Sequence, residues 1–269
     1  MYKVFGVRHE YFYGGVLTID ILDCNANCIF CFTEREKERK EVTASLDYFI
    51  PEDQKQGYQY KIWGRSKNNR PVDDSRSDND EYALIPADEI AVEICKFAND
   101  NGYPKIRISS GEPATNFDDL LAFLDAFSAN RTSQLFILET NGKTIGQYPE
   151  KAEKLAEYLP WLYIHLSLKT PDKVKYVRCE CGSAMNFDHS RNAVDVLADL
   201  QFFQENKSHV VFVWDLLEKN DIESIKQDYV SRGIKIEYET IYFYNFINNR
   251  IRNAKCDDLF ITELDKIYS

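Results

Sequence analysis

The stretch VLTIDILDCNANCIFC (16–31) joins a strand-like segment directly to three closely spaced cysteines. Residues 16–22 are apolar and rich in β-branched side chains, which predicts a β-strand. Cys24, Cys28 and Cys31 follow in the loop at the carboxyl end of that strand. Because functional groups collect at the carboxyl ends of parallel strands, this stretch predicts both the fold and the position of a site.

An alternation of helix and strand continues along the rest of the chain. We expect helices at residues 86–102, 117–129, 149–158, 188–206 and 221–232. We expect further strands at residues 105–110, 134–140, 162–168, 210–216 and 235–241. This alternation predicts an α/β fold with a parallel sheet, built either as an open doubly wound sheet or as a full or partial barrel.

Length and composition favour one domain with an insertion. A chain of 269 residues that is 44% hydrophobic, with 17 Phe and 17 Tyr, has enough apolar area for one large core. We expect a single domain over residues 1–269, with an insertion at about 33–80 and a short C-terminal extension at about 242–269. The insertion is polar and leaves from the cysteine loop, so it is either a substrate-gating lid or a disordered charged loop.

The charge and the cysteine count narrow the class of protein. A net charge of −11 and a pI near 5.0 disfavour nucleic acid and anionic membranes as partners. The sequence has no leader-like apolar segment and no apolar run long enough to span a membrane, so we expect a soluble cytoplasmic protein. In a reducing compartment, seven cysteines are better explained by metal binding or catalysis than by disulfides.

Three thiolates in one loop favour an iron–sulfur cluster with an open position. Four thiolates normally complete a structural zinc site or a cluster, whereas three leave one metal position free for a small molecule that chelates through amino and carboxylate groups. A Cys3His zinc site and buried unliganded thiols are the alternatives. For zinc, the nearest histidine is His9 at the far end of a strand, and the chain has no second C-x-x-C pair.

The spacing Cys24-x3-Cys28-x2-Cys31, with Phe30 before the last cysteine, resembles the signature of the radical S-adenosylmethionine (SAM) enzymes. The resemblance implies a partial (βα)6 barrel and a 4Fe-4S cluster on the three cysteines, with Phe30 at the cofactor site. It also implies a flavodoxin- or ferredoxin-type electron donor. In that family the reduced cluster splits SAM into methionine and a 5′-deoxyadenosyl radical that abstracts hydrogen from a substrate.

The segment SSGEP (109–113) resembles the Gly-Gly-Glu-Pro segment of that family, with serine in place of the first glycine. The resemblance implies that Ser109, Ser110, Gly111 and Glu112 hold the SAM amino group, chiefly through backbone carbonyls. Taken alone, the segment could equally be an ordinary turn from strand to helix.

Two further segments resemble the glycyl-radical-enzyme activases of the same family. LETNG (138–142) matches their Asp-Thr-Asn-Gly stretch, and SLK (167–169) matches their Asp-x-Lys. The match implies that Thr140, Asn141 and Ser167 approach the ribose or methionine end of SAM and that Lys169 faces its carboxylate. Glu139 and Ser167 replace aspartates of the activases, which argues against a monovalent-cation site of the activase kind.

The remaining cysteines and histidines give weaker signals. Cys179 and Cys181 are expected in the loop after the fourth strand of the alternation and, with Cys256, could hold a second metal. Cys95 is expected in the core and His165 in the interior of a strand.

The favoured interpretation is a radical SAM oxidoreductase that acts on a protein, a peptide or a small molecule. The sequence assigns no catalytic side chain. An RNA-modifying radical SAM enzyme and a non-enzymatic iron–sulfur or zinc-binding protein are the alternatives.

Overall fold

The computed structural model describes residues 1–10, 15–31, 33, 38–50, 80–180, 184–205 and 208–239. These residues form two compact units. The described residues of the first unit fall within Met1–Leu22, Lys37–Gly111 and Asp118–Phe136, and those of the second fall within Asp23–Glu36, Glu112–Phe117 and Ile137–Ser269. Most of the expected insertion and all of the expected C-terminal extension lie outside the described residues, so the single domain, its boundaries and the lid stay predictions.

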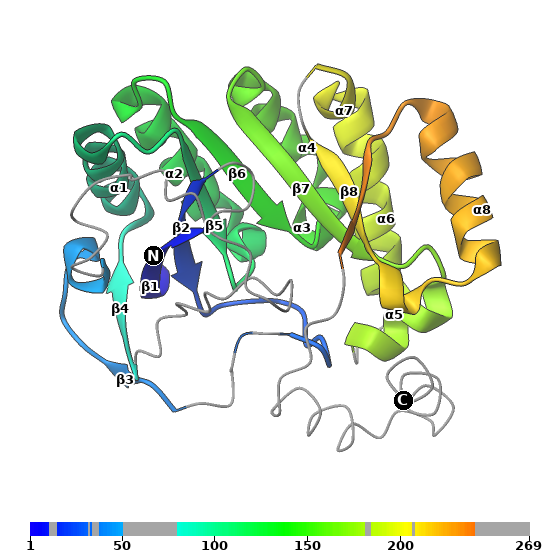
Figure 1. The fold of residues 1–269 in the computed structure, drawn as a ribbon, viewed down its shortest axis with the longest axis horizontal. Helices are drawn as coiled ribbons and strands as arrows, with labels where there is room; N and C mark the ends of the chain where they lie inside the picture. Colours follow the sequence, from blue (N-terminus) through cyan, green and yellow to red (C-terminus); the bar gives the residue numbers. More distant parts are fainter. Residues whose placement is uncertain are drawn as a thin grey trace, which may run out of the picture. The chain divides into compact units, whose positions relative to one another are not determined.

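The first unit contains five strands in the order β3-β4-β1-β2-β5 (Figure 1). They are β1 (Tyr2–Glu10), β2 (Val16–Ile21), β3 (Lys40–Glu41), β4 (Glu81–Ile85) and β5 (Lys105–Ser109). Strand β1 runs antiparallel to β2 and β4, whereas β2 and β5 run parallel. Strands β2 and β5 were predicted from the sequence, whereas β1, β3 and β4 were not. In β1, Lys3, Arg8 and His9 interrupt the apolar, β-branched run that marks β2.

Among its described residues, the first unit also contains two α-helices and a short 3-10 turn, η2 (Leu46–Phe49). Helix α1 (Ala87–Asn101) buries Cys95 on its apolar face, which confirms the expected core position. It ends at Gly102, whose φ of 75° suits the left-handed C-cap that glycine adopts without strain. Helix α2 (Phe117–Asn130) packs Phe123 and Phe127 against Phe136, with ring centroids 4.9 and 5.3 Å from the ring of Phe136.

The second unit contains four strands in the order β6-β7-β8-β9, of which β7, β8 and β9 pair in parallel. They are β6 (Leu135–Thr140), which begins in the first unit, β7 (Leu162–Lys169), β8 (His209–Val213) and β9 (Ile236–Glu239). The α-helices are α3 (Lys143–Gln147), α4 (Pro149–Ala152), α5 (Lys173–Glu180), α6 (Ala184–Asp199), α7 (Phe202–Glu205) and α8 (Lys219–Asp228). The 3-10 turns are η4 (Pro113–Thr115), η5 (Glu153–Tyr158), η6 (Trp214–Leu216) and η7 (Val230–Arg232).

The structure corrects several boundaries in this unit. The helix expected at 188–206 begins earlier, at Ala184, and breaks at Gln201, whose φ is 68°. The strand expected at 210–216 ends at Val213, and η6 follows it. Helix α5 was not expected at all, and it places Cys179 in a helix and buried rather than in a loop. Cys181 and Cys256 lie outside the described residues.

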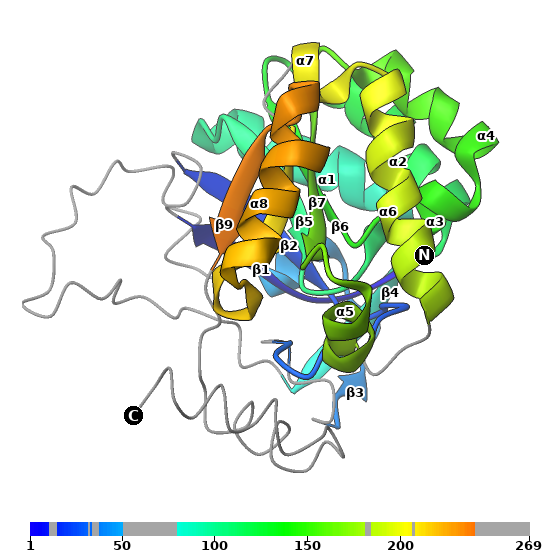
Figure 2. The same ribbon diagram turned by 90° about the vertical axis from the view of Figure 1, so that its right-hand side faces the viewer.

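Helices α6 and α8 lie on one face of the strands of the second unit (Figures 1 and 2). Leu166 of β7 and Ala193 of α6 both pack against Gly142, and Phe212 of β8 packs against Tyr229, which follows α8. Side chains alternate along a strand, so His165 and Ser167 of β7 point to the opposite face. His165 is buried there, as expected, with its ring centroid 3.9 Å from that of His209.

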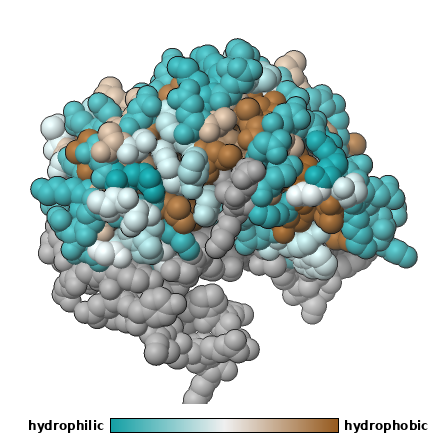
Figure 3. Space-filling model, turned by 90° about the horizontal axis from the view of Figure 1, so that it is seen from above, coloured by the Kyte–Doolittle hydropathy of each residue, from teal (hydrophilic) through white to brown (hydrophobic). Residues whose placement is uncertain are grey.

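The described surface gives no sign of a membrane span. No helix among the described residues is both long and apolar enough to cross a membrane. On the face drawn in Figure 3, the described residues are largely hydrophilic, and apolar residues form separate patches.

Helices α3 and α6 approach each other so closely at Gly146 that a side chain does not fit. A Cβ at this position would lie 1.9 Å from the carbonyl oxygen of His189, a backbone atom that cannot move aside alone. We therefore expect Gly146→Ala to lower the free energy of unfolding by about 3 kcal/mol. Chemical denaturation measures this, with Gly233→Ala as the control. Gly233 has φ of 76° and open space around it, so the control should lose only about 1–2 kcal/mol; an equal loss at both positions would contradict the close approach.

The interior position of His165 predicts sensitivity to acid. Burial, with a smaller contribution from His209, lowers the pKa of His165 to about 3, whereas an unfolded histidine titrates near 6.5. Between these values the unfolded chain binds the extra proton, so stability falls as the pH falls through this window. His165→Gln should reduce the slope of unfolding free energy against pH between pH 6 and pH 4, by up to roughly 1.4 kcal/mol per pH unit. Above pH 7 the wild type and His165→Gln should show the same slope. Equal slopes between pH 6 and pH 4 would contradict the prediction.

Candidate functional site

The three cysteines lie in one loop of the second unit. Cys24, Cys28 and Cys31 are all half-buried, and none of the cysteines in the described ranges forms a disulfide. The loop turns through hydrogen bonds of its own, from the Ala26 amide to the Cys24 sulfur at 3.4 Å and from the Cys31 amide to the Cys28 carbonyl at 3.1 Å. Burial raises the pKa of the Cys28 thiol to about 11, while the charge of Lys169 acts in the opposite direction.

Glu112 fixes the start of this loop. Its amide donates to the Asp23 carbonyl at 2.7 Å, and its buried carboxylate accepts from the Thr140 hydroxyl at 2.7 Å and the Asn141 amide at 2.6 Å. Burial raises the pKa of Glu112, although these hydrogen bonds oppose the shift. Glu112 therefore joins the cysteine loop, through its amide, to the end of β6, through its carboxylate.

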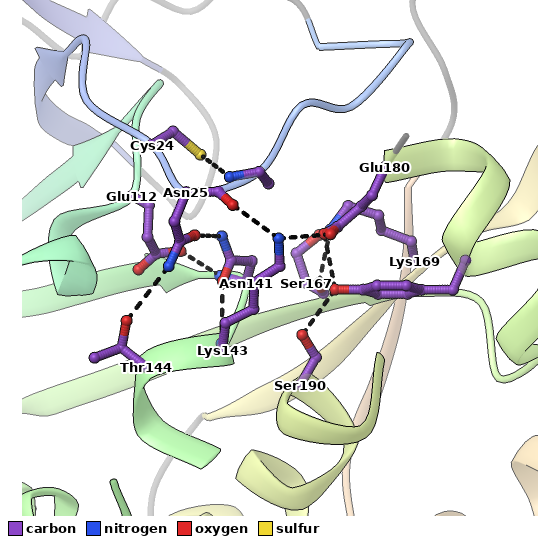
Figure 4. A network of polar contacts seen from close by, with 12 residues as sticks. Cys24, Asn25, Glu112, Asn141, Lys143, Thr144, Ser167, Lys169, Glu180 and Ser190 are labelled. Atoms are coloured by element: carbon purple, nitrogen blue, oxygen red, sulfur yellow. Dashed lines mark hydrogen bonds and ion pairs between the residues drawn. The ribbon is translucent and has the colours of Figure 1, made fainter. Parts of the chain in front are cut away.

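Asn25, inside the cysteine loop, bonds to the segment that follows β6 (Figure 4). The Asn141 side-chain amide donates to Asn25 Oδ1 at 2.7 Å, and Asn25 Nδ2 donates to the Thr144 hydroxyl at 3.4 Å. Asn141 Oδ1 in turn accepts from the Lys143 amide at 3.0 Å. Both polar ends of the Asn141 side chain are thus engaged within the protein.

A buried array of two lysines and one glutamate lies beside this contact (Figure 4). Glu180 forms ion pairs with Lys143 at 2.6 Å and Lys169 at 2.9 Å, and all three side chains are at most 6% exposed. Burial favours the neutral acid, but Lys169 and Lys143 outweigh it and lower the pKa of Glu180. Burial also opposes the charge on Lys169, but Cys28 and Glu180 raise the pKa of Lys169 well above its ordinary value. Glu180 and Lys169 therefore both carry a charge at neutral pH.

The SSG part of SSGEP belongs to the first unit and shows why the resembled motif has glycine. Ser110 has φ of 72°, a left-handed conformation that costs a residue with a side chain about 1–3 kcal/mol. Its hydroxyl donates to Asp20 at 2.6 Å, and Asp20 also pairs with Arg8 at 2.6 Å. The Gly111 amide donates to the Ser109 carbonyl at 2.9 Å, which closes the turn. Serine thus replaces glycine at a strained position and gains a charged hydrogen bond.

The expected site residues fall into two groups. The second unit contains most of them: Cys24, Cys28, Phe30, Cys31, Glu112, Thr140, Asn141, Ser167 and Lys169, whereas Ser109, Ser110 and Gly111 are described in the first unit. Phe30 is half-buried and packs against Cys179, Val213 and Leu216. Ser167 is half-buried on β7, where its carbonyl accepts a long 3.4 Å hydrogen bond from the Lys169 ammonium.

Three important residues were missed. Asn25 lies within the cysteine signature and Lys143 directly follows ETNG, so each had a positional signal. Glu180 had none, because α5 was not expected and its polar sequence shows no clear amphipathic pattern.

The donor set fits an iron–sulfur cluster. No group of three His, Cys, Asp or Glu side chains within the described ranges converges on the position of a single metal ion. A 4Fe-4S cluster does not require such convergence, because each thiolate binds a different iron. Three half-buried thiols from one hydrogen-bonded loop are the donors that such a cluster takes.

Comparison with known proteins agrees with this assignment. The family model described as the radical SAM superfamily matches residues 19–229, a range that holds the cysteine loop and the ends of β5, β6 and β7. No match was found among curated proteins. The match and the mostly parallel α/β architecture confirm the predicted partial (βα)6 barrel class. The chain therefore belongs to the radical SAM superfamily, whose members are enzymes that use a 4Fe-4S cluster and SAM.

Proposed function

We propose that Cys24, Cys28 and Cys31 hold the 4Fe-4S cluster and that the strand ends around them bind SAM. When bound and reduced, the cluster supplies the electron that cleaves SAM to methionine and a 5′-deoxyadenosyl radical, which abstracts hydrogen from the substrate. One observation carries the proposal: Glu112 and Asn141, from the two motifs that follow β5 and β6, bond directly to the cysteine loop.

Lys169 is the side chain that we propose for the SAM carboxylate. It is buried and charged at the end of β7, where its φ of 69° and a shift in the pairing with β8 turn it out of the strand. Its electrostatic interaction with Cys28 supports a place beside the cluster. A buried ammonium of this kind binds a carboxylate more strongly than an exposed one, because water competes less.

The other proposed SAM contacts act mainly through the backbone or by position. We propose that the backbone carbonyls of Ser109, Ser110 and Gly111 bind the amino group of SAM. We propose Glu112 as a positioning residue, because its carboxylate is hydrogen-bonded within the protein. Phe30, Thr140, Asn141 and Ser167 complete the proposed set. Since the Asn141 side chain also holds Asn25, its loss should disturb the cysteine loop as well as SAM.

We propose a protein, peptide or small molecule as the hydrogen donor and a flavodoxin- or ferredoxin-type protein as the electron donor. The net charge of −11 supports a substrate other than RNA, since phosphate binding normally needs an excess of basic residues. Sub-micromolar, salt-sensitive binding to bulk tRNA would instead favour RNA modification. The proposed likeness to activases rests on Asn141 and Lys169 and departs from them at Glu139 and Ser167.

The cysteine loop provides the first test. Anaerobic reconstitution of the wild-type chain should give a 4Fe-4S protein that forms 5′-deoxyadenosine from SAM after reduction by dithionite. Cys24→Ala, Cys28→Ala and Cys31→Ala should each abolish the cluster and this turnover, because two thiolates do not hold it. Cys95→Ala is the control and should keep both, since Cys95 is buried on α1. Stoichiometric zinc without iron uptake would contradict the assignment.

The second test concerns Lys169. Lys169→Met should weaken SAM binding roughly tenfold or more, because a hydrogen bond to a charged group contributes about 1.5–3 kcal/mol. Titration calorimetry on anaerobically reconstituted protein measures the Kd, and iron content verifies that the cluster remains. Lys173→Met removes an equal charge from the same unit at an exposed position and should leave the Kd unchanged. An unchanged Kd in Lys169→Met would contradict the proposed contact.

A further inference from the structure

Two consecutive residues at the end of α5 hold the cysteine loop on both sides of Cys28. The Cys179 carbonyl accepts from the Ile29 amide at 2.9 Å, between the second and third cysteines. The next residue, Glu180, binds Lys143, whose ammonium donates to the Asn25 carbonyl at 3.0 Å, between the first and second cysteines. The end of α5 therefore restrains both spacers of the signature.

Glu180 is itself held firmly. Its side chain is fully buried, and it accepts from the Tyr176 hydroxyl at 2.7 Å and the Lys169 ammonium at 2.9 Å and forms an ion pair with Lys143. The Tyr176 hydroxyl lies 2.7 Å from the Ser190 hydroxyl of α6, and the Lys169 ammonium lies 5.1 Å from the centre of the Tyr176 ring. A buried carboxylate with several good hydrogen bonds has a defined position, which a solvent-exposed ion pair lacks.

The charges of this array do not cancel. Lys143 and Lys169 contribute two positive charges and Glu180 one negative charge, so one positive charge remains buried beside the cysteine loop. In a medium of low dielectric such a charge acts strongly on neighbouring charged groups. A 4Fe-4S cluster gains one negative charge on reduction, so the net charge of the array bears on its reduction potential.

We propose that Glu180 is a positioning residue that fixes the cysteine loop through Lys143 and sets the net charge beside the cluster. The part that concerns the cluster rests on the proposed function. Glu180 holds the two ammonium groups in place and neutralises one of them, so the cluster meets one net positive charge instead of two.

The charge count gives opposite expectations for the two single variants. Glu180→Gln keeps the size of the side chain and leaves two positive charges, which favours the reduced cluster and raises its reduction potential. Lys143→Met leaves an array without net charge, which lowers the potential. The double variant Lys143→Met/Glu180→Gln restores one positive charge and should return the potential close to that of the wild type.

The experiment is a redox titration of the anaerobically reconstituted full chain, without SAM, followed by electron paramagnetic resonance of the reduced cluster. The matched controls are Lys173→Met and Asp188→Asn, which make the same charge changes in an exposed ion pair of 2.7 Å in the same unit. Both controls should keep the wild-type potential, because water and salt screen exposed charges.

The variant Glu180→Asp distinguishes the positioning role of Glu180 from its effect on the net charge, because it keeps the charge but shortens the side chain. We expect it to keep a potential near that of the wild type but to lose iron faster to a chelator, because the contact to Lys143 is stretched. Chelator-driven iron loss at the wild-type rate would overturn the positioning role.

Three outcomes keep this inference distinct from the proposed function. Absence of a cluster in the wild type would refute the proposed function and not only the role of Glu180. A wild-type cluster with shifts of the same sign in Glu180→Gln and Lys143→Met, or with no shift in either, would refute the charge role alone. If Glu180→Gln does not fold, Lys143→Met decides, since an unchanged or raised potential there contradicts the inference.

Discussion

The cysteine loop depends on hydrogen bonds from other segments of the chain. Residues 23–31 form neither helix nor strand, so their backbone groups lack the partners that regular structure supplies. Glu112, Lys143 and Cys179 supply partners for the backbone of the loop, and Asn141 bonds to the side chain of Asn25. Glu112, the segment that follows β6 and the end of α5 thereby determine where the three thiols lie.

The sequence predicted the framework of the fold better than its irregular parts. Strands β2, β5, β6 and β7 and helices α1 and α2 were located within about two residues. Continuous apolar runs mark the buried strands, and apolar periodicity marks the helices. The apolar pattern of the sequence did not predict strand β1 or helix α5. Charged and polar residues interrupt the apolar run of β1, and α5 is stabilised by contacts of Tyr176 and Glu180 that depend on the tertiary structure.

The candidate site was likewise predicted only in part. Cysteine spacing and the short motifs identified residues that the second unit brings together, since they occupy fixed places after successive strands. Their individual roles were less accessible. Glu112 and Asn141 were expected to approach a ligand, but their side chains bond to the protein. Glu180 binds two lysines, one at the start of α3 and one at the end of β7. Such partnerships join residues far apart in the chain, and no local pattern encodes them.

The long sequence separation of these contacts has a consequence for the order of events during synthesis. Asn25 is linked to Asn141, Lys143 and Thr144, which lie 116 to 119 residues further along the chain. The ribosome releases the cysteines long before it has made these partners, and domains fold as their segments become available. The nascent cysteine loop is therefore exposed and lacks its final shape until α5 has been made. The complete set of partners of the cysteine loop therefore exists only after at least the first 180 residues have been translated.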